Sequence, residues 1–167
     1  MRSPPKHYNL GMILDATEAD SSHIEDITVR ADAFGDDEIE AIGALWEEYL
    51  ILGAEDSGYN FLVDRDGDII RGFVCYGPRD LADGVYDLYY LVVDPNHHRQ
   101  GIGRRLLTAG EREAKMTGAR MIIGETSGGT AREPIRELCR GAGYQAEATI
   151  KDLFGEGEDL MFFVKRF

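Results

Sequence analysis

The sequence has few of the features that mark secreted or membrane proteins. It contains only two cysteines in 167 residues, and Cys75 and Cys139 are too far apart for a disulfide framework or a Cys/His zinc site. No apolar run approaches the ~20 residues that span a bilayer, and the N-terminal residues lack the apolar core and cleavage site of a signal peptide. We therefore expect a soluble, cytoplasmic protein with reduced thiols and no membrane partner.

Positive charge is scarce as well. The 18 Lys and Arg residues are outnumbered by 31 Asp and Glu residues, which gives a formal net charge of −13. Such a surface repels a phosphate backbone, which binding proteins normally meet with clustered cations, so we expect no nucleic-acid partner. An acidic surface could attract a cationic amine substrate, but it could equally serve solubility or salt adaptation. Charge alone therefore selects no substrate.

Short apolar segments separated by Gly, Asp and Pro clusters predict an alternation of strands and helices. The predicted elements are a strand from Asp26, a helix over 36–52, a hairpin over 59–77, a strand over 85–93, a helix over 102–117, a strand over 120–127, a helix over 134–140 and a final hairpin over 144–167. We expect residues 1–25 to form an N-terminal extension and residues 26–167 to form a single α/β domain. Its mixed sheet would have about seven strands with helices on its faces.

Two candidate metal sites fail on spacing. In the turn over residues 64–68, the Gly is fourth where a calcium-binding loop needs it sixth, and no Glu follows at position twelve. His97 and His98 are adjacent, so their side chains point apart, and neither has a partner at ligand spacing. We expect no metal.

The segment that predicts chemistry links the strand over 85–93 to the following helix. A strand that runs into a Gly-containing turn and a helix N-terminus directs several backbone N–H groups at one place, where an anion can bind. Gly101 and Gly103 lack a Cβ and would let the backbone approach a phosphate closely. Three arginines add positive charge: Arg99, Arg104 and Arg105. Alternatively, the glycines only form a turn and the arginines only a solvated helix face.

The sequence VVDPNHHRQGIGRRLL resembles the acyl-CoA-binding motif of the Gcn5-related N-acetyltransferase (GNAT) superfamily. In that motif, a strand ending in Val-x-Pro is followed by Arg/Gln-x-x-Gly-x-Gly/Ala and a helix. The segments MIIGETS and PIRELCRGAGYQ also look like the family's successive core elements, so the resemblance covers about residues 26–167. It implies a mostly antiparallel seven-stranded sheet whose two central parallel strands splay apart, with helices on both faces. Acetyl-CoA, as cosubstrate, would lie in the gap.

The resemblance also implies which residues bind the cosubstrate. Leu91, Val92 and Val93 would supply backbone partners for pantetheine, and the amide N–H of Val93 would stabilise the oxyanion. The pyrophosphate would rest on the following loop, mainly on its main-chain N–H groups: Arg99, Gln100, Gly101, Ile102, Gly103 and Arg104.

Two positions depart from the family pattern. His98 stands where the motif has Arg or Gln. Cys139 stands where family members often carry a Tyr that protonates the leaving CoA thiolate. Cys139 could donate a proton instead, since its reference pKa of ~8.5 is close to that of a thiol leaving group. It could also simply pack in the core.

Acetyl transfer to an amine needs a group that removes a proton from the nitrogen. Glu125 is the preferred candidate because a carboxylate at the end of a strand can be partly desolvated, and Asp87 is the alternate. Either could instead be a salt-bridged or solvated strand residue.

Strand alternation predicts which side chains share a face of the strand over 85–93. Tyr89, Leu91 and Val93 would share one face, and Tyr90 and Val92 the other. The aromatic side chains could line an acceptor site or pack the sheet.

The sequence thus predicts an acetyl-CoA-dependent N-acetyltransferase. It would transfer the acetyl group directly to a primary amine of a small molecule or of a peptide or protein. A non-catalytic acyl-CoA-binding or sensing module is the alternative, because of the two departures from the motif. The apolar segment over 159–167 could pair with a second copy in a homodimer, or it could complete its own sheet.

Overall fold

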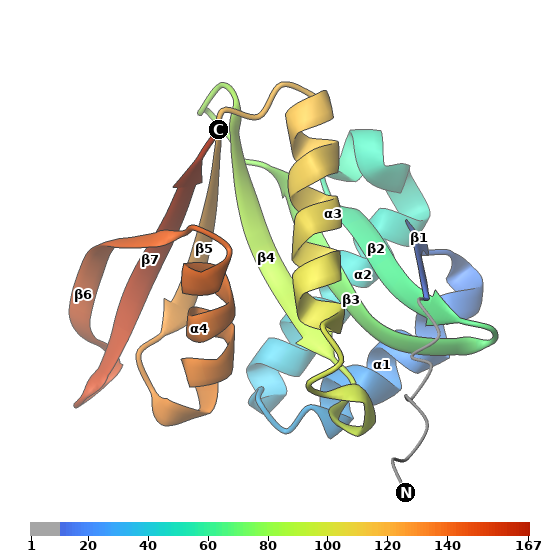
Figure 1. Ribbon diagram of the computed structural model, residues 1–167, viewed down its shortest axis with the longest axis horizontal. Coiled ribbons are helices and arrows are strands. Elements are labelled where there is room, and N and C mark those ends of the chain that lie inside the picture. Colours follow the sequence, from blue (N-terminus) through green and yellow to red (C-terminus); the bar gives the residue numbers. More distant parts are fainter. Residues whose placement is uncertain (1–10) are drawn as a thin grey trace, which may run out of the picture.

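Residues 11–167, which the computed structural model describes, form a seven-stranded sheet with helices on both faces (Figure 1). The strands are β1 (Met12–Asp15), β2 (Asn60–Asp66), β3 (Ile69–Pro78), β4 (Val85–Val93), β5 (Met121–Ser127), β6 (Gln145–Gly155) and β7 (Glu158–Arg166). Their order is β1-β2-β3-β4-β5-β7-β6. Within this part of the chain, β4 and β5 are the one parallel pair. The expected α/β architecture is confirmed.

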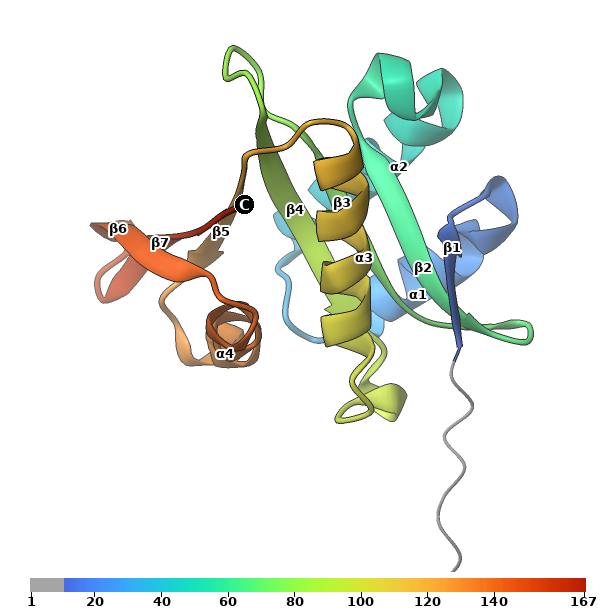
Figure 2. The same ribbon diagram turned by 45° about the horizontal axis from the view of Figure 1, so that its top comes forward.

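The helices form two layers, one on each side of the sheet. They are α1 (Ser21–Arg30), α2 (Asp36–Ser57), α3 (Ile102–Met116) and α4 (Glu133–Gly141), with short 3-10 turns η1 (Glu18–Asp20), η2 (Pro95–His97) and η3 (Thr130–Arg132). Helices α3 and α4 lie on one side, and α1 and α2 on the other (Figure 2). We call these sides the α3 face and the α1 face. Among the described helices, none has both the length and the apolar content that crossing a membrane requires.

The predicted strand from Asp26 is wrong, because this segment belongs to α1. Its run of β-branched residues favours a strand locally. The buried positions Ile24, Ile27 and Thr28 nevertheless follow helical spacing, and Val29 is 60% exposed. The first strand is instead β1, which pairs with β2. The expected boundary at residue 26 therefore falls inside a helix, and the sheet begins before it.

The other predicted elements are confirmed, some with shifted ends. Strand β4 has the predicted bounds, and β2 and β3 form the predicted hairpin. Helix α2 extends five residues past the predicted end at Leu52, to Ser57. Gly53, at φ 76° and ψ 171°, interrupts its helical backbone. The predicted end thus coincides with a real break in the helix.

The two parallel strands separate halfway along their length. Their pairing joins Val85–Leu88 of β4 to Met121–Gly124 of β5 and then stops. Beyond that point, β4 stays paired with β3, and β5 with β7. Figure 1 shows the two strands diverging toward the end of the sheet that carries the β4–α3 loop. The splayed arrangement that the GNAT resemblance implies is therefore present.

The last hairpin completes the sheet of its own chain. Strand β7 lies between β5 and β6, so its backbone is paired on both sides. The free edge at this end of the sheet is β6, whose eleven residues are all exposed, and β1 forms the edge at the other end. Pairing of residues 159–167 with a second copy is therefore wrong for this fold.

Candidate functional site

The β4–α3 loop begins at a buried carboxylate. Asp94 is 4% exposed and accepts a hydrogen bond from the Asn96 amide at 2.9 Å, which caps η2. Arg30, the last residue of α1, donates from Nη1 and Nη2 to its two oxygens at 2.7 and 3.0 Å. Burial raises the pKa of Asp94, but the Arg30 guanidinium and the Asn96 amide outweigh it and hold the pKa below the usual range. The Asp-Pro pair could have indicated this cap, whereas nothing local in the sequence points to Arg30.

The two loop glycines serve different purposes. Gly101, immediately before α3, has φ +77°, a left-handed conformation that costs other residues free energy, and a Cβ there would meet nothing within 4 Å. Gly103 lies inside the first turn of α3, where a Cβ would approach Leu138 Cδ2 to 3.1 Å and Val93 Cγ2 to 3.6 Å. Gly101 therefore sets the direction of the backbone, and Gly103 allows α4 to pack closely against α3.

The N-terminus of α3 can receive an anion. The helix has no side-chain cap hydrogen bond and no acidic residue in its first turn. The N–H groups of a first turn have no partner within their own helix, and the helix dipole favours negative charge there. The main-chain N–H groups of Ile102, Gly103 and Arg104 lie in this first turn, and their use in binding the pyrophosphate stays a prediction.

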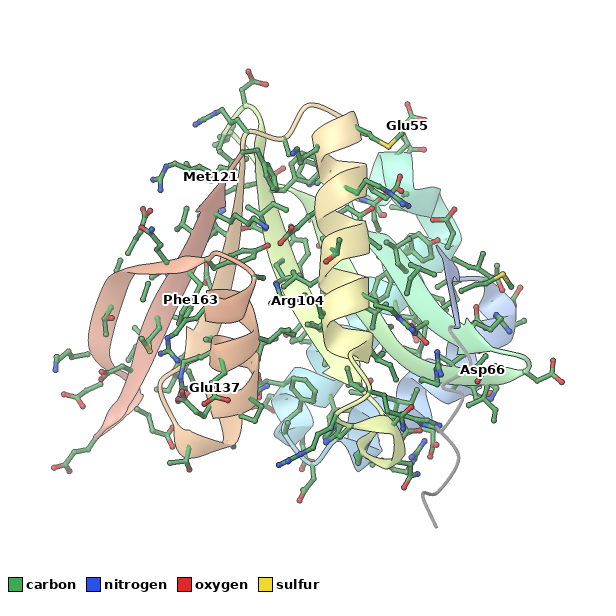
Figure 3. The ribbon with its side chains drawn as sticks, in the orientation of Figure 1. Glu55, Asp66, Arg104, Met121, Glu137 and Phe163 are labelled. Carbon is green, nitrogen blue, oxygen red and sulfur yellow. The ribbon has the colours of Figure 1, made fainter. Side chains whose placement is uncertain are left out.

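Three arginines lie near this turn, and two of them contact other parts of the protein. Arg104 projects from α3 toward α4 (Figure 3), where its Nη2 donates to the Gly141 carbonyl at 2.5 Å. Arg105 forms an ion pair with the fully buried Asp64, so it is already engaged. Arg99 is exposed, has φ 60°, and makes no ion pair with residues 11–167. Arg99 therefore remains available to a ligand.

His98 folds back onto the strand that precedes the loop. Its Nε2 lies 3.2 Å from the carbonyl oxygen of Val93. The side chain that departs from the family motif therefore ties the loop to the end of β4.

Backbone groups of β4 face the opening between the strands. The Asp94 amide donates to the Arg71 carbonyl on β3 at 2.9 Å. Successive N–H groups of a strand point to opposite sides, so the Val93 N–H faces away from β3, as does that of Leu91. On this side β5 has already diverged. The predicted pantetheine stretch, Leu91 to Val93, therefore offers an unpaired edge.

A β-bulge changes the predicted faces of β4. Cys75 of β3 pairs with Tyr90 and Tyr76 pairs with Leu88, so Tyr89 is an extra residue without a partner. Tyr89 and Tyr90 consequently both pack on the α1 face with Val92. The predicted placement of Tyr89 on the face of Leu91 and Val93 is wrong, because one inserted residue reverses the alternation.

The predicted carboxylates Asp87 and Glu125 come together at the point where β4 and β5 separate. Leu88 packs on the α3 face, and a Cβ on Gly124 would approach it, so alternation directs both carboxylates to the α1 face. Arg79, from the β3–β4 loop, joins them. Its Nε lies 2.8 Å from Asp87 Oδ1, and its Nη2 lies 2.7 Å from Glu125 Oε1. Sequence reasoning missed Arg79, since no local pattern marks it.

The two carboxylates differ in environment. The Asp87 side chain is 14% exposed and the Glu125 side chain 42%. Burial raises the pKa of Asp87, and Arg79 offsets only part of this effect. Asp87 is thus the more desolvated of the two.

Cys139 is a buried residue of α4. It is 4% exposed, in the apolar cluster of the α3 face. Burial, with a smaller contribution from Glu111, raises the pKa of its thiol to about 11. Proton transfer from such a thiol to a thiolate of ordinary basicity, whose pKa is about 8.5, is unfavourable.

Two open hollows flank α3, with volumes of about 490 and 420 Å³. Neither is lined by a residue of β4 or β5. On the α3 face, Leu138 of α4 and Val93 of β4 pack in the same apolar cluster. Within residues 11–167, no three His, Cys, Asp or Glu side chains are grouped so as to hold a metal ion.

Comparison with known proteins supports the same family. The model of the acetyltransferase (GNAT) family matches residues 19–133, more than half of the chain. No curated protein matches the sequence.

Several solved structures share the fold. A GNAT-family protein of Desulfovibrio desulfuricans is 29% identical, with 93% of this chain and 98% of that chain covered and a TM-score of 0.88. The ribosomal-protein-alanine N-acetyltransferase of Brucella melitensis is 25% identical, with 93% and 99% covered and a TM-score of 0.74. A Salmonella typhimurium structure with its cofactor acetyl-CoA is 24% identical, with 95% and 94% covered and a TM-score of 0.73. The family match, the splayed strands and the glycine loop agree: this chain belongs to the GNAT acetyltransferase family.

Proposed function

We propose that the protein is an acetyl-CoA-dependent N-acetyltransferase that transfers the acetyl group directly to a primary amine of a small molecule, peptide or protein. The observation that carries this proposal is the unpaired edge of β4 beside the α3 N-terminus. There the Val93 N–H faces the break between β4 and β5, one loop away from the anion-binding turn.

The cosubstrate fits this arrangement from the α3 face. Its pyrophosphate would accept hydrogen bonds from the first-turn amides of α3, with Arg99 adding charge. Its pantetheine would run along the free edge of Leu91 to Val93, as a partial replacement for the missing strand pairing. Acetyl-CoA in the similar Salmonella structure supports this choice of ligand.

The acceptor amine would approach from the α1 face, where Asp87 and Glu125 lie. We propose Asp87 as the base ahead of Glu125, because it is more buried and its pKa is raised. The amine gives a proton to Asp87, directly or through water, and its nitrogen bonds to the thioester carbonyl carbon. The Val93 N–H stabilises the oxyanion. When the carbon–sulfur bond breaks, the proton taken up by Asp87 passes through solvent water to the thiolate, which regenerates the carboxylate; Cys139 is too weak an acid to supply it.

Two measurements test the proposal. Isothermal titration with acetyl-CoA and CoA should show binding, and no binding at high micromolar ligand would refute it. Free-thiol release should then be followed with three amine probes: a peptide with an N-terminal alanine, a lysine-containing peptide and spermidine. The alanine peptide is included because the similar Brucella protein is a ribosomal-protein-alanine N-acetyltransferase.

An acyl-CoA-binding module without catalysis is the second candidate. The absence of the family's tyrosine at Cys139 and the engagement of both carboxylates by Arg79 favour it. Tight binding of acetyl-CoA without CoA release for any amine probe would support the module.

We further propose that the protein works in the cytoplasm without a nucleic-acid partner, as its free buried thiols and acidic composition suggest. If it forms a homodimer, we propose pairing through the edge strand β6, all of whose residues are exposed. Sedimentation of the wild-type protein and of a variant with Ile150→Lys on this strand would test the dimer.

A further inference from the structure

Arg79 occupies a position that joins three parts of the fold. Its side chain reaches from the β3–β4 loop to Asp87 on β4 and to Glu125 on β5. Its own amide donates to the Val85 carbonyl at 2.8 Å, which fixes the base of the side chain at the start of β4. A single guanidinium therefore spans the two strands just where their pairing ends.

This contact has the geometry of a strong interaction. Nε lies 2.8 and 3.1 Å from the two oxygens of Asp87, while Nη2 remains on Glu125 at 2.7 Å. Charge-assisted hydrogen bonds of this kind fix orientation as well as charge, and the fork of an arginine can hold two acceptors at once. A lysine could supply the charge but not this geometry.

We propose that Arg79 is a positioning residue for acetyl transfer: it holds the Asp87 carboxylate at the point where β4 and β5 separate and fixes Glu125 beside it. This inference rests on the proposed function. Both carboxylates contact Arg79, and Asp87 acts as the base because it is the more buried of the two.

The groups around Asp87 predict how its titration changes when Arg79 is replaced. The charged and titratable groups near it are Arg79 and Asp80 of the β3–β4 loop, Glu125 of β5 and Tyr89 of its own strand. Burial, Glu125 and Asp80 all raise the pKa of Asp87, and Arg79 alone lowers it. When the positive charge is removed, the pKa of Asp87 must rise. A base acts in its deprotonated form, so the acid limb of the pH–rate profile moves to higher pH.

The experiment compares Arg79→Gln, Arg79→Lys and the matched control Arg120→Gln. Arg120 also holds the β3–β4 loop, since its Nε donates to the Asp83 carbonyl at 2.9 Å, but it contacts neither carboxylate. The profile of kcat/KM against pH is measured with acetyl-CoA and the amine probe that gives the fastest CoA release. In parallel, the Asp87 carboxyl is titrated by carbon-detected NMR in each variant.

We expect Arg79→Gln to lower kcat about tenfold or more, to leave the KM for acetyl-CoA within about twofold, and to move both the acid limb and the Asp87 titration to higher pH. Arg79→Lys should recover part of kcat and return the acid limb toward wild type. Arg120→Gln should match the wild-type profile.

The outcomes distinguish a failure of the proposed role of Arg79 from a failure of the proposed function. If wild type transfers acetyl and Arg79→Gln keeps its pH profile and Asp87 titration, the role of Arg79 is overturned while the proposed function stands. If Arg120→Gln shifts the profile as much as Arg79→Gln, the effect belongs to the loop, and the role of Arg79 is again overturned. If wild type releases no CoA with any probe, the proposed function falls, and this inference falls with it.

Discussion

At the scale of single residues, His98 shows how a departure from a family motif can be accommodated. Its ring bonds to the Val93 carbonyl, which belongs to the strand that would bind pantetheine. An imidazole therefore links the loop to the strand at the position where the motif has a longer polar side chain. The side chain at this position thus holds the loop through a contact with the strand before it.

His98→Ala should weaken CoA binding about fivefold, since one side-chain hydrogen bond contributes about 1 kcal/mol. His98→Gln, which restores a residue of the motif, should bind CoA within about twofold of wild type. The exposed His23 on α1 provides the control, His23→Ala, which should leave binding unchanged. Calorimetric titration with CoA measures the affinity of the three variants. Equal affinity of His98→Ala and wild type would contradict the expected role of His98.

At the scale of elements, α3 has a left-handed glycine at each end. Gly101 precedes the helix with φ +77°, and Gly118 follows it with φ +96°, and a Cβ at either would meet nothing within 4 Å. A side chain would be strained at both positions, but only Gly101 lies at the predicted phosphate site.

Gly101→Ala and Gly118→Ala should each destabilise the protein by about 1 kcal/mol, because alanine is strained at positive φ. Only Gly101→Ala should also weaken CoA binding, because the strain misdirects the first-turn amides. Chemical denaturation and calorimetry give the two quantities. A loss of CoA affinity in Gly118→Ala as large as that in Gly101→Ala would show that general destabilisation is responsible.

The sequence predicted elements well where the signals were local. Turn glycines and apolar periodicity located β4, α3 and the two hairpins, and the motif indicated the splayed strands. The strand predicted from Asp26 failed because β-branched residues outweighed the helical spacing of the buried positions. The bulge at Tyr89 has no signature in composition. Arg30 and Arg79 were missed because their partners, 64 and up to 46 residues away in the chain, are brought near only by the fold.

At the scale of the whole molecule, the dominant electrostatic feature is the net negative charge. A formal charge of −13 on a chain of this length implies repulsion among surface carboxylates. The buried ion pairs, such as Asp64 with Arg71, are shielded from salt, whereas the surface repulsion is not. Added salt should therefore stabilise the fold.

The melting temperature should rise between 0.05 and 0.5 M sodium chloride, where the Debye length falls from about 14 to about 4 Å. Differential scanning calorimetry at constant pH measures it, with sucrose at matched osmolality as the control for preferential exclusion. A melting temperature that falls with salt would mean that favourable surface ion pairs outweigh the repulsion.

The pairing between β4 and β5 ends at Leu88 and Gly124, with α3 and α4 on one face of the sheet and Asp87 and Glu125 on the other. The proposed routes therefore lie on opposite faces of the sheet, the α3 face for the cosubstrate and the α1 face for the acceptor. Neither substrate blocks the other. Both must then be bound together before CoA leaves, so initial-rate plots should intersect rather than run parallel. Parallel lines would instead require an acetylated protein side chain as an intermediate. The separation of β4 and β5 thus bears on the kinetic mechanism as well as on the place of the chemistry.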